Sequence, residues 1–248
     1  MKGVITAAGL GKRSGLDGKM RKEMLPVYDV RNGKLVLRPI IDVIISGFLR
    51  QGIRRIAVVL DPSDRWTREY IETEFSDVQI LYQEEKRGFG HAVLMAKDFV
   101  GSDSFILNAG DGLVLRKDVL PEIVKSSDSG VYLTLMQVTN PQRYGTAEII
   151  ERDVGISVIS VVEKSEAPPS NFALCALYGL PSDIFQHLEA DSSHIIELTP
   201  AINKLIASGS NTRAMVIDRT EWVSVGKAES YVDVLKLTLD RCRESLTL

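Results

Sequence analysis

The chain has 248 residues, a formal net charge of −3 and 44% hydrophobic residues. That length is enough for one large α/β domain with its own core, and the acidic balance argues against a dedicated nucleic-acid-binding protein. No apolar run approaches the length of a membrane span, and residues 1–10 lack the apolar core of a signal peptide. Cys175 and Cys242 show no metal-ligand spacing. We therefore expect a cytoplasmic protein that keeps both cysteines reduced.

The first half of the chain alternates strand-like and helix-like segments. Short aliphatic and β-branched runs predict strands at 3–8, 55–60, 78–83 and 104–109. Helices are predicted at 39–50, 66–75 and 91–100. This alternation indicates a parallel sheet covered by helices on both faces. In such a sheet ligands bind beyond the carboxyl ends of the strands, so the turns after Ala8, Gln83 and Ala109 mark the predicted ligand edge.

The second half has a different pattern. Four consecutive strands are predicted at 131–138, 146–151, 156–163 and 172–180. They are followed by helices at 182–188 and 199–207, a strand at 213–217 and a helix from about 228. Consecutive strands indicate an antiparallel extension of the sheet or a small lobe over its ligand edge. No repeat or long linker separates the halves, so we predict a single domain over residues 1–248.

A glycine-rich turn containing Gly9 and Gly11 follows the first predicted strand. Backbone N–H groups exposed in such a turn can cradle an anion. Arg13 and Lys22 place two cations within reach of the same turn. This combination suits a protein that binds a nucleoside triphosphate and acts on its phosphates.

Two better-known glycine loops do not fit this turn. The P-loop needs Ser or Thr after Gly-Lys, and here Gly11-Lys12 is followed by Arg13. The dinucleotide fingerprint needs its third glycine three residues after the second, whereas Gly15 comes four later. Its acidic residue, expected about twenty positions on, has its nearest candidate in Asp61. Both alternatives are therefore disfavoured.

Nine short motifs stand in one order over nearly the whole chain: 7–13 (AAGLGKR), 22–27 (KEMLPV), 87–93 (RGFGHAV), 108–111 (NAGD), 143–146 (RYGT), 162–164 (VEK), 168–173 (PPSNFA), 197–202 (ELTPAI) and 222–226 (WVSVG). Together they resemble the sugar-1-phosphate nucleotidylyltransferases, and they are most similar to the bacterial-type UTP–glucose-1-phosphate uridylyltransferases. Each motif is weak by itself, and their shared order makes the resemblance specific.

This resemblance implies a Rossmann-like mixed, mainly parallel sheet with helices on both faces and a small antiparallel sugar-binding extension. It implies Mg²⁺-dependent transfer of a nucleotidyl group from UTP or TTP onto a sugar 1-phosphate, with release of pyrophosphate. Within the single domain, the nucleotide part would span about 1–130, the sugar-phosphate part about 131–227 and a C-terminal helix 228–248. We expect that helix to pack on the core, although packing on another subunit of a homo-oligomer is also open.

The most similar activity makes UDP-glucose from UTP and glucose 1-phosphate. A thymidylyltransferase of the same fold is the alternative enzyme. A catalytically impaired homologue that binds a sugar nucleotide as a regulatory subunit is the alternative from another class.

The reaction joins two anions, so charge neutralisation and positioning are needed rather than a protein nucleophile. A cation about 4 Å from a phosphate charge contributes roughly 4 kcal/mol at an effective dielectric constant of 20. Arg13 and Lys22 are the candidates for the triphosphate, and Lys164 is the candidate for the sugar 1-phosphate. The loop between Arg13 and Lys22 is one residue shorter than the family's and lacks its Pro-x-Thr stretch.

Gln83 ends a predicted strand, and its amide offers both an acceptor and a donor to the edge of uracil or thymine. Gly88 would let the backbone approach the base. The backbone of Ala8, Gly9 and Gly11 would contact the nucleotide on its other side, and Glu23 is placed to touch the base or the ribose.

Asp111 follows an apolar strand, where a carboxylate would meet Mg²⁺ at the phosphates. The family usually has a second metal-binding aspartate where this chain has Ser224. Water, Asp218 or Glu221 could take that place. The loss of one carboxylate motivates the impaired-homologue alternative.

On the sugar side, Glu163 can accept hydrogen bonds from hydroxyl groups and Lys164 can neutralise the 1-phosphate. Neighbouring strand residues point to opposite faces, so both can serve only if the strand ends or bulges there. Gly145 and Asn171 complete the sugar site by resemblance, and Ala176 stands where the family often has glycine.

Overall fold

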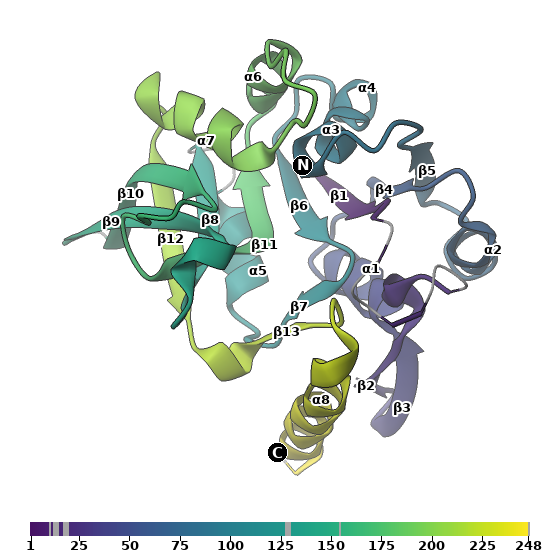
Figure 1. Ribbon diagram of the computed structural model, residues 1–248. Helices are drawn as coiled ribbons and strands as arrows, with labels where there is room; N and C mark the ends of the chain where they lie inside the picture. Colours follow the sequence, from purple (N-terminus) through teal and green to yellow (C-terminus); the bar gives the residue numbers. More distant parts are fainter. Residues whose placement is uncertain (10, 12–14, 17–19, 127–129, 154, 248) are drawn as a thin grey trace.

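The computed structural model describes residues 1–9, 11, 15–16, 20–126, 130–153 and 155–247. Its centre is a nine-stranded mixed sheet with the strand order β5-β4-β1-β6-β11-β8-β12-β10-β9 (Figure 1). This arrangement confirms the mixed α/β fold predicted from the sequence. Helices cover both faces of the sheet and enclose a hydrophobic cluster on each side.

The first part of the sheet is parallel. It contains β1 (Lys2–Ala7), β4 (Ile56–Leu60), β5 (Gln79–Tyr82) and β6 (Phe105–Ala109). β1, β4 and β6 are buried along their whole length, as their continuous aliphatic sequences require. The helices of this part are α1 (Ile40–Arg50), α2 (Arg65–Glu74), α3 (Phe89–Leu94) and α4 (Lys97–Val100).

The helix predicted at 91–100 is two helices. The N–H group of Ala96 bonds to the carbonyl of Val93 instead of continuing the α-helical pattern. This tighter i→i+3 turn separates α3 from α4. The prediction missed it because the apolar spacing runs unbroken through the turn.

The second part extends the same sheet, as one of the two sequence alternatives predicted. Its strands are β8 (Val131–Gln137), β9 (Gly145–Arg152), β10 (Gly155–Glu163), β11 (Phe172–Leu180) and β12 (Thr212–Ile217). β11 pairs antiparallel with β6 and so joins the two parts. Three helices pack on this part: α5 (Val119–Ser126), α6 (Ile184–Glu189) and α7 (Leu198–Ala207).

The sequence analysis missed two pairs of strands. β2 (Pro26–Arg31) and β3 (Lys34–Pro39) form a hairpin around Asn32 and Gly33, both at positive φ, which is the turn that Asn-Gly favours. β7 (Gly112–Val114) and β13 (Trp222–Ser224) form a second small antiparallel sheet. Short 3₁₀ helices complete the chain at η1 (Lys22–Met24), η3 (Pro141–Arg143), η4 (Arg219–Glu221) and η5 (Ala228–Ser230).

The last helix, α8 (Tyr231–Leu246), packs against β2. The hydroxyl of Tyr231 donates to the carbonyl of Pro26 at 2.5 Å, and the N–H group of Tyr28 donates to Oγ1 of Thr238 at 3.3 Å. These contacts confirm the expected packing on the core. Cys175 and Cys242 are buried and form no disulfide. In the described part of the chain, no helix combines the length and apolar character that a bilayer span requires.

Candidate functional site

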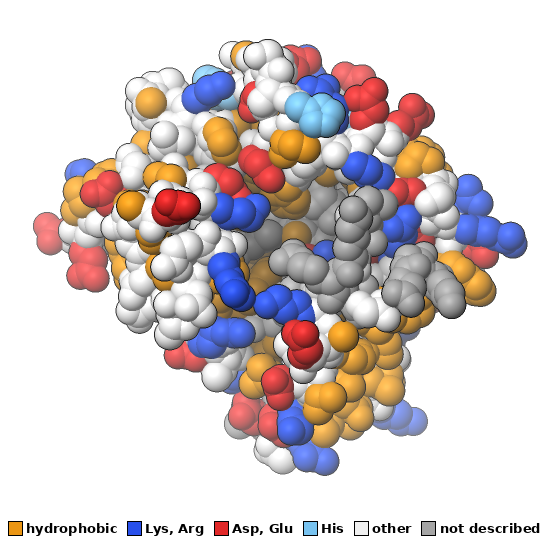
Figure 2. All heavy atoms as spheres, in the orientation of Figure 1, with side chains coloured by type: hydrophobic (Ala, Val, Ile, Leu, Met, Phe, Trp, Pro, Cys, Tyr) orange, Lys and Arg blue, Asp and Glu red, His pale blue; other side chains and the backbone are white. Residues whose placement is uncertain are grey.

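Two adjoining cavities open at the predicted ligand edge of the sheet. The first has a volume of about 390 Å³ and is lined by Thr6, Ala8, Gly9, Gly11, Lys22, Glu23, Gln83, Lys86, Gly88, Phe89, Ala92, Ala109, Asp111 and Gly226. The second has a volume of about 220 Å³ and is lined by Phe89, Ala109, Gly145, Glu163, Lys164, Leu174, Tyr178, Glu197, Leu198 and Thr199. Because Phe89 and Ala109 line both, the cavities are neighbours. Figure 2 shows Lys and Arg side chains around the hollow in the middle of this face.

A larger cavity of about 470 Å³ lies between α1, β7 and α8. It is lined by none of the residues predicted to bind substrate. We therefore place the candidate active site at the two adjoining cavities, where the predicted residues converge.

Lys22 and Asp111 meet in the first cavity. η1 presents Lys22, and Asp111 follows β6; the Lys22 Nζ lies 2.5 Å from Oδ2 of Asp111. A Cβ atom built on Gly9 would lie 3.9 Å from the same Nζ, so the glycine turn is close by. The structure thus brings together the predicted cation, the predicted metal ligand and the anion-binding turn. Arg13, the other predicted cation, lies outside the described residues.

Glu23 lies beside this pair and is 1% exposed. Its Oε1 is 4.0 Å from the Lys22 Nζ, and no described residue makes a hydrogen bond to its buried Oε2. Burial raises the pKa of Glu23 to about 8; Lys22 opposes this shift and Asp111 adds to it. At neutral pH the carboxyl therefore carries a proton and can donate a hydrogen bond to a nucleotide.

The side chain of Gln83 is buried at the end of β5. Its Nε2 lies 3.0 Å from the carbonyl of Gly88 and 3.2 Å from Nδ1 of His91. Burial lowers the pKa of His91, and Arg87 lowers it further, so its neutral ring can accept this bond. In the His91 tautomer that leaves Nδ1 unprotonated, both amide hydrogens of Gln83 are engaged within the protein. Oε1 of Gln83 is then the acceptor left for a ligand, and the predicted contact of Gln83 with a base stays a prediction.

Gly88 has φ = 103°, and a Cβ atom built on it would lie 2.6 Å from the carbonyl oxygen of Ile196. A Cβ atom on Gly90 would lie 2.7 Å from the carbonyl carbon of Glu197. No ordinary side chain fits at either position. The glycines of this motif therefore let residues 195–197 approach α3, which places Glu197 at the second cavity.

Arg21 contacts the backbone of the glycine turn that lines the first cavity. Its guanidinium donates to the carbonyl of Gly9 at 3.3 Å and to Oγ of Ser63 at 3.2 Å. It also forms ion pairs with Asp61 at 3.4 Å and Asp64 at 4.0 Å. The side chains of Arg21, Asp61 and Asp64 are all less than 10% exposed. This buried network fixes the position of the Gly9 carbonyl.

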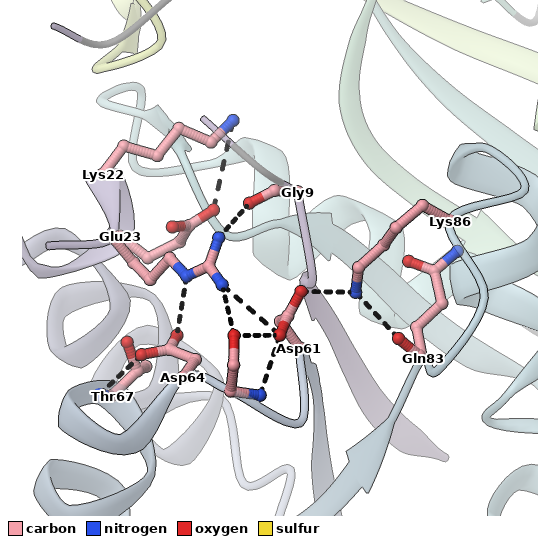
Figure 3. A network of polar contacts seen from close by, with 10 residues as sticks. Gly9, Lys22, Glu23, Asp61, Asp64, Thr67, Gln83 and Lys86 are labelled. Carbon is pink, nitrogen blue, oxygen red and sulfur yellow. Dashed lines mark hydrogen bonds and ion pairs between the residues drawn. The ribbon is translucent and has the colours of Figure 1, made fainter. Parts of the chain in front are cut away.

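Lys86 joins the same network from the other side of Asp61 (Figure 3). Its Nζ lies 2.7 Å from Oδ2 of Asp61 and donates to the carbonyl of Gln83 at 2.8 Å. Burial acts to raise the pKa of Asp61, but hydrogen bonds from Lys86 and Ser63 lower it to about 2. The sequence analysis assigned no role to Arg21 or Lys86, because their partners are distant in sequence and only the fold brings them together.

Glu163 and Lys164 meet in the second cavity. β10 ends at Glu163, and Lys164 adopts a left-handed conformation with φ = 38°. This break in the strand satisfies the condition predicted from the sequence, and the Lys164 Nζ lies 2.7 Å from Oε1 of Glu163. The second oxygen of Glu163 accepts a hydrogen bond from Oγ1 of Thr199 at 2.6 Å.

Two further residues of this cavity, Glu197 and Thr199, were missed as site residues. Oε1 of Glu197 lies 3.9 Å from the Lys164 Nζ, and burial raises its pKa. Both residues belong to the motif at 197–202. That motif is part of the family resemblance, but no function was assigned to its residues from the sequence. A Cβ atom on Gly145 would lie 3.0 Å from Oε2 of Glu163 and from Oγ1 of Thr199, so glycine is the residue that lets these two side chains pack against the backbone.

Asn171 does not line either cavity. Its side chain is exposed, and its backbone carbonyl accepts a hydrogen bond from the N–H group of Val138. The structure therefore gives Asn171 a role in pairing β8 with the start of β11. It does not bring this residue to the predicted sugar site.

Ser224 faces Asp111 across Gly226. A Cβ atom on Gly226 would lie 3.3 Å from both Oδ2 of Asp111 and Oγ of Ser224. Asp218 and Glu221 do not supply a further carboxylate, because each bonds to backbone at the start of η4, closing a capping box. The described residues contain no cluster of three or more His, Cys, Asp or Glu suited to a metal ion.

This donor set fits a magnesium ion that shares its coordination with phosphate. Mg²⁺ takes one or two carboxylates and completes its shell with phosphate oxygens and water. Asp111 offers one carboxylate and Ser224 one hydroxyl where Asp111 and Gly226 line the first cavity. Lys22 would have to exchange its contact with Asp111 for one with a phosphate.

Comparisons with known proteins agree with this geometry. The family model described as nucleotidyl transferase matches residues 2–241, so the chain belongs to this family. The chain is 30% identical over 249 residues to the low-salt glycan biosynthesis nucleotidyltransferase of Haloferax volcanii; the match covers 97% of the chain and 66% of that relative's length, just under two thirds. It is 28% identical to a glucose-1-phosphate thymidylyltransferase of Mycolicibacterium smegmatis, over 94% of the chain and 80% of that protein.

The solved structure of UDP-glucose pyrophosphorylase from Acinetobacter baumannii is similar throughout. It has a TM-score of 0.78 and 25% identity, and the match covers 99% of this chain and 98% of that one. The family and the fold implied by the sequence resemblance are therefore confirmed.

Proposed function

We propose that the protein is a sugar-1-phosphate nucleotidylyltransferase that makes UDP-glucose and pyrophosphate from UTP and glucose 1-phosphate. The observation that carries this proposal is the pair of adjoining cavities, each with its own lysine. Lys22 lies in one beside Asp111, and Lys164 lies in the other beside Glu163. We assign the nucleotide to the part at about 1–130 and the sugar 1-phosphate to the part at about 131–227.

In the proposed reaction, a phosphate oxygen of the sugar 1-phosphate attacks the α-phosphorus of UTP. The bond from that phosphorus to the oxygen that bridges to the β-phosphate breaks, and pyrophosphate leaves with the bonding electrons. Lys164 neutralises the incoming phosphate and Lys22 neutralises the triphosphate, so the two anions can approach. Asp111 and Ser224 would hold Mg²⁺, which supplies further charge neutralisation when bound.

The sugar would be held by the second cavity. The carboxylates of Glu163 and Glu197 can accept hydrogen bonds from its hydroxyl groups, and Thr199 fixes the position of Glu163. Gly145 lines the same cavity, and its lack of a side chain lets Glu163 and Thr199 lie close to its backbone. Glucose is the proposed sugar because of the resemblance to the uridylyltransferases.

The base is the less constrained part of the proposal. Oε1 of Gln83 can accept the N3–H group of either uracil or thymine. Thymidylyl transfer is therefore the second candidate function, and the similarity to the M. smegmatis thymidylyltransferase favours it.

The direct test is pyrophosphate release by the purified protein with Mg²⁺, with UTP and TTP crossed against the 1-phosphates of glucose, galactose and N-acetylglucosamine. We expect release with UTP and glucose 1-phosphate. If no combination releases pyrophosphate and UTP or UDP-glucose still binds in calorimetry, the regulatory homologue is favoured instead.

Ser224→Asp separates an active site from an impaired one. It restores a second carboxylate next to Asp111, so it should tighten Mg²⁺ binding in calorimetry with UTP present. If the wild type releases no pyrophosphate and this variant does, the natural chain is a catalytically impaired homologue.

A further inference from the structure

Lys86 is a cation in the first cavity that has no assigned role. It follows β5 by a few residues and lines the cavity together with Gln83. Its side chain is 28% exposed, with Nζ 2.7 Å from Oδ2 of Asp61 and 2.8 Å from the carbonyl of Gln83. An ammonium group has three N–H donors. Within the described part of the chain, two of them have partners and the third has none.

Asp61 does not depend on Lys86 alone. Its other oxygen already accepts from the N–H group of Ser63 at 2.8 Å and from the Ser63 hydroxyl at 2.5 Å, and it pairs with Arg21. The ion pair with Asp61 is therefore not needed to hold Asp61, and its main effect is on the side chain of Lys86. It restrains a long, flexible side chain in one position, so that less conformational entropy is lost when the third N–H binds a ligand.

Gln83 presents no hydrogen-bond donor to the cavity, so a base bound there needs a donor from another residue. With the proton of neutral His91 on Nε2, Gly88 and His91 engage both hydrogens of the Gln83 amide, so Gln83 offers the cavity an acceptor alone. That acceptor matches the N3–H group of uracil or thymine. The carbonyl groups on either side of N3 are acceptors and need donors, which Gln83 cannot supply.

We propose that Lys86 donates a hydrogen bond to a carbonyl oxygen of the base, at position 2 or 4, and so determines base specificity together with Gln83. This inference rests on the proposed function, since it requires a nucleotide in the first cavity. Cytosine has an acceptor at N3 and an amino group at C4, so it would meet the wrong partner at Gln83. The site therefore selects uracil or thymine over cytosine.

Calorimetric titration with UTP, 2-thio-UTP, 4-thio-UTP and CTP, with Mg²⁺ present, tests the proposal without requiring turnover. Sulfur accepts hydrogen bonds weakly, so one of the two thio analogues should bind the wild type about 10-fold or more weakly than UTP. The analogue that binds weakly identifies the carbonyl that Lys86 contacts. CTP should bind more weakly than either.

Lys86→Met removes the donor. This variant should bind UTP roughly 10- to 100-fold more weakly, as expected for loss of a hydrogen bond from a charged group. It should also bind UTP and the discriminating thio analogue equally. Because that comparison is made within one variant, it does not depend on a small change in stability. Lys97→Met is the matched control, because it removes an exposed lysine that pairs with Glu189 on the surface.

Two results would overturn the assignment of Lys86. One is UTP affinity in Lys86→Met within twofold of the Lys97→Met control. The other is an equal loss of affinity for UTP and both thio analogues, which would mean that Lys86 acts through the network alone. If wild-type protein releases pyrophosphate from UTP while either result holds, the proposed function stands and the lysine assignment is wrong. If the wild type binds no nucleoside triphosphate, both proposals are wrong.

Discussion

The two cavities of the site are built differently. At the glycine turn of the nucleotide cavity, Arg21, Asp61 and Asp64 form ion pairs with side chains that are less than 10% exposed. In the sugar cavity, the side chain of Lys164 is 57% exposed and that of Glu163 is 22% exposed. Buried ion pairs are screened little by salt, whereas exposed pairs hold their geometry weakly. The Arg21–Asp61–Asp64 support of the proposed nucleotide cavity is thus held more firmly than Lys164 in the proposed sugar cavity.

This difference suggests an order in which the two substrates bind in the proposed reaction. A cavity whose supporting side chains are already fixed loses little conformational entropy on binding, so the nucleotide should bind first. Its phosphates would then attract Lys22 away from Asp111, and Lys164 would neutralise the sugar 1-phosphate that binds second. Each of the following changes affects one side of this comparison.

The largest effect is expected from Lys22→Met, on the nucleotide side. Removing a cation about 4 Å from a phosphate costs roughly 4 kcal/mol at an effective dielectric constant of 20, which is about a 10³-fold loss of rate. The measurement is the initial rate of pyrophosphate release at saturating substrates. Lys97→Met, on the exposed surface, should leave the rate unchanged. A loss of less than tenfold in Lys22→Met would remove Lys22 from the mechanism.

Glu23→Gln should alter the pH dependence of stability. The pKa of Glu23 is raised to about 8 by burial. Its folded form holds a proton that the unfolded chain loses near pH 4.5, so wild-type stability is greatest below that pH and falls as the pH rises to 8. The expected loss between pH 5 and pH 8 is roughly 3 kcal/mol.

Glu23→Gln removes this slope because an amide does not titrate. Urea unfolding at pH 5 and pH 8 measures it, with the exposed Glu72→Gln as control. An equal pH dependence in wild type and Glu23→Gln would show that Glu23 is ionised in the folded protein.

Asp61→Asn tests the buried network in the acid range. The pKa of Asp61 is lowered to about 2, because hydrogen bonds from Lys86 and Ser63 outweigh burial. Its contribution is present above the unfolded value near 3.8 and is lost as the pH falls through 2, which amounts to about 2 kcal/mol between pH 5 and pH 2. The variant should be less stable at pH 5 and should lose less on acidification. Unfolding curves of Asp77→Asn, an exposed site, should follow the wild type.

Lys164→Met, on the sugar side, should have the smallest effect. The exposed ammonium is screened by solvent, so we expect about a tenfold rise in KM for the sugar 1-phosphate with little change in KM for UTP. The wild-type KM for the sugar 1-phosphate should also rise with salt more than the KM for UTP does. An equal salt dependence of the two KM values would remove the distinction between the cavities.

The sequence predicted those parts of the site that depend on local pattern. Strand ends placed Gln83 and Asp111 at one edge of the sheet, and a broken strand allowed Glu163 and Lys164 to meet. The family resemblance added Gly145, which lines the second cavity. These features follow from residues close together in the chain.

Features that depend on distant pairing were not predictable in this way. Arg21 meets Asp61 across forty residues, and only the fold brings β4 next to the glycine turn. The Nε2 group of Gln83 contacts the carbonyl of Gly88 and Nδ1 of His91. These contacts depend on how the first turn of α3 is placed. The β2–β3 hairpin was not among the predicted strands, although Asn32-Gly33 is a pair that favours a tight hairpin turn.

Calorimetry with uridine 5′-(α,β-imido)triphosphate, which does not transfer its nucleotidyl group, tests the central claim most directly. The buried support of the proposed nucleotide cavity predicts that this analogue binds the protein alone with Mg²⁺. It also predicts that glucose 1-phosphate binds measurably only after the analogue is present. Binding of glucose 1-phosphate to the protein alone, as tightly as in the presence of the analogue, would contradict the account.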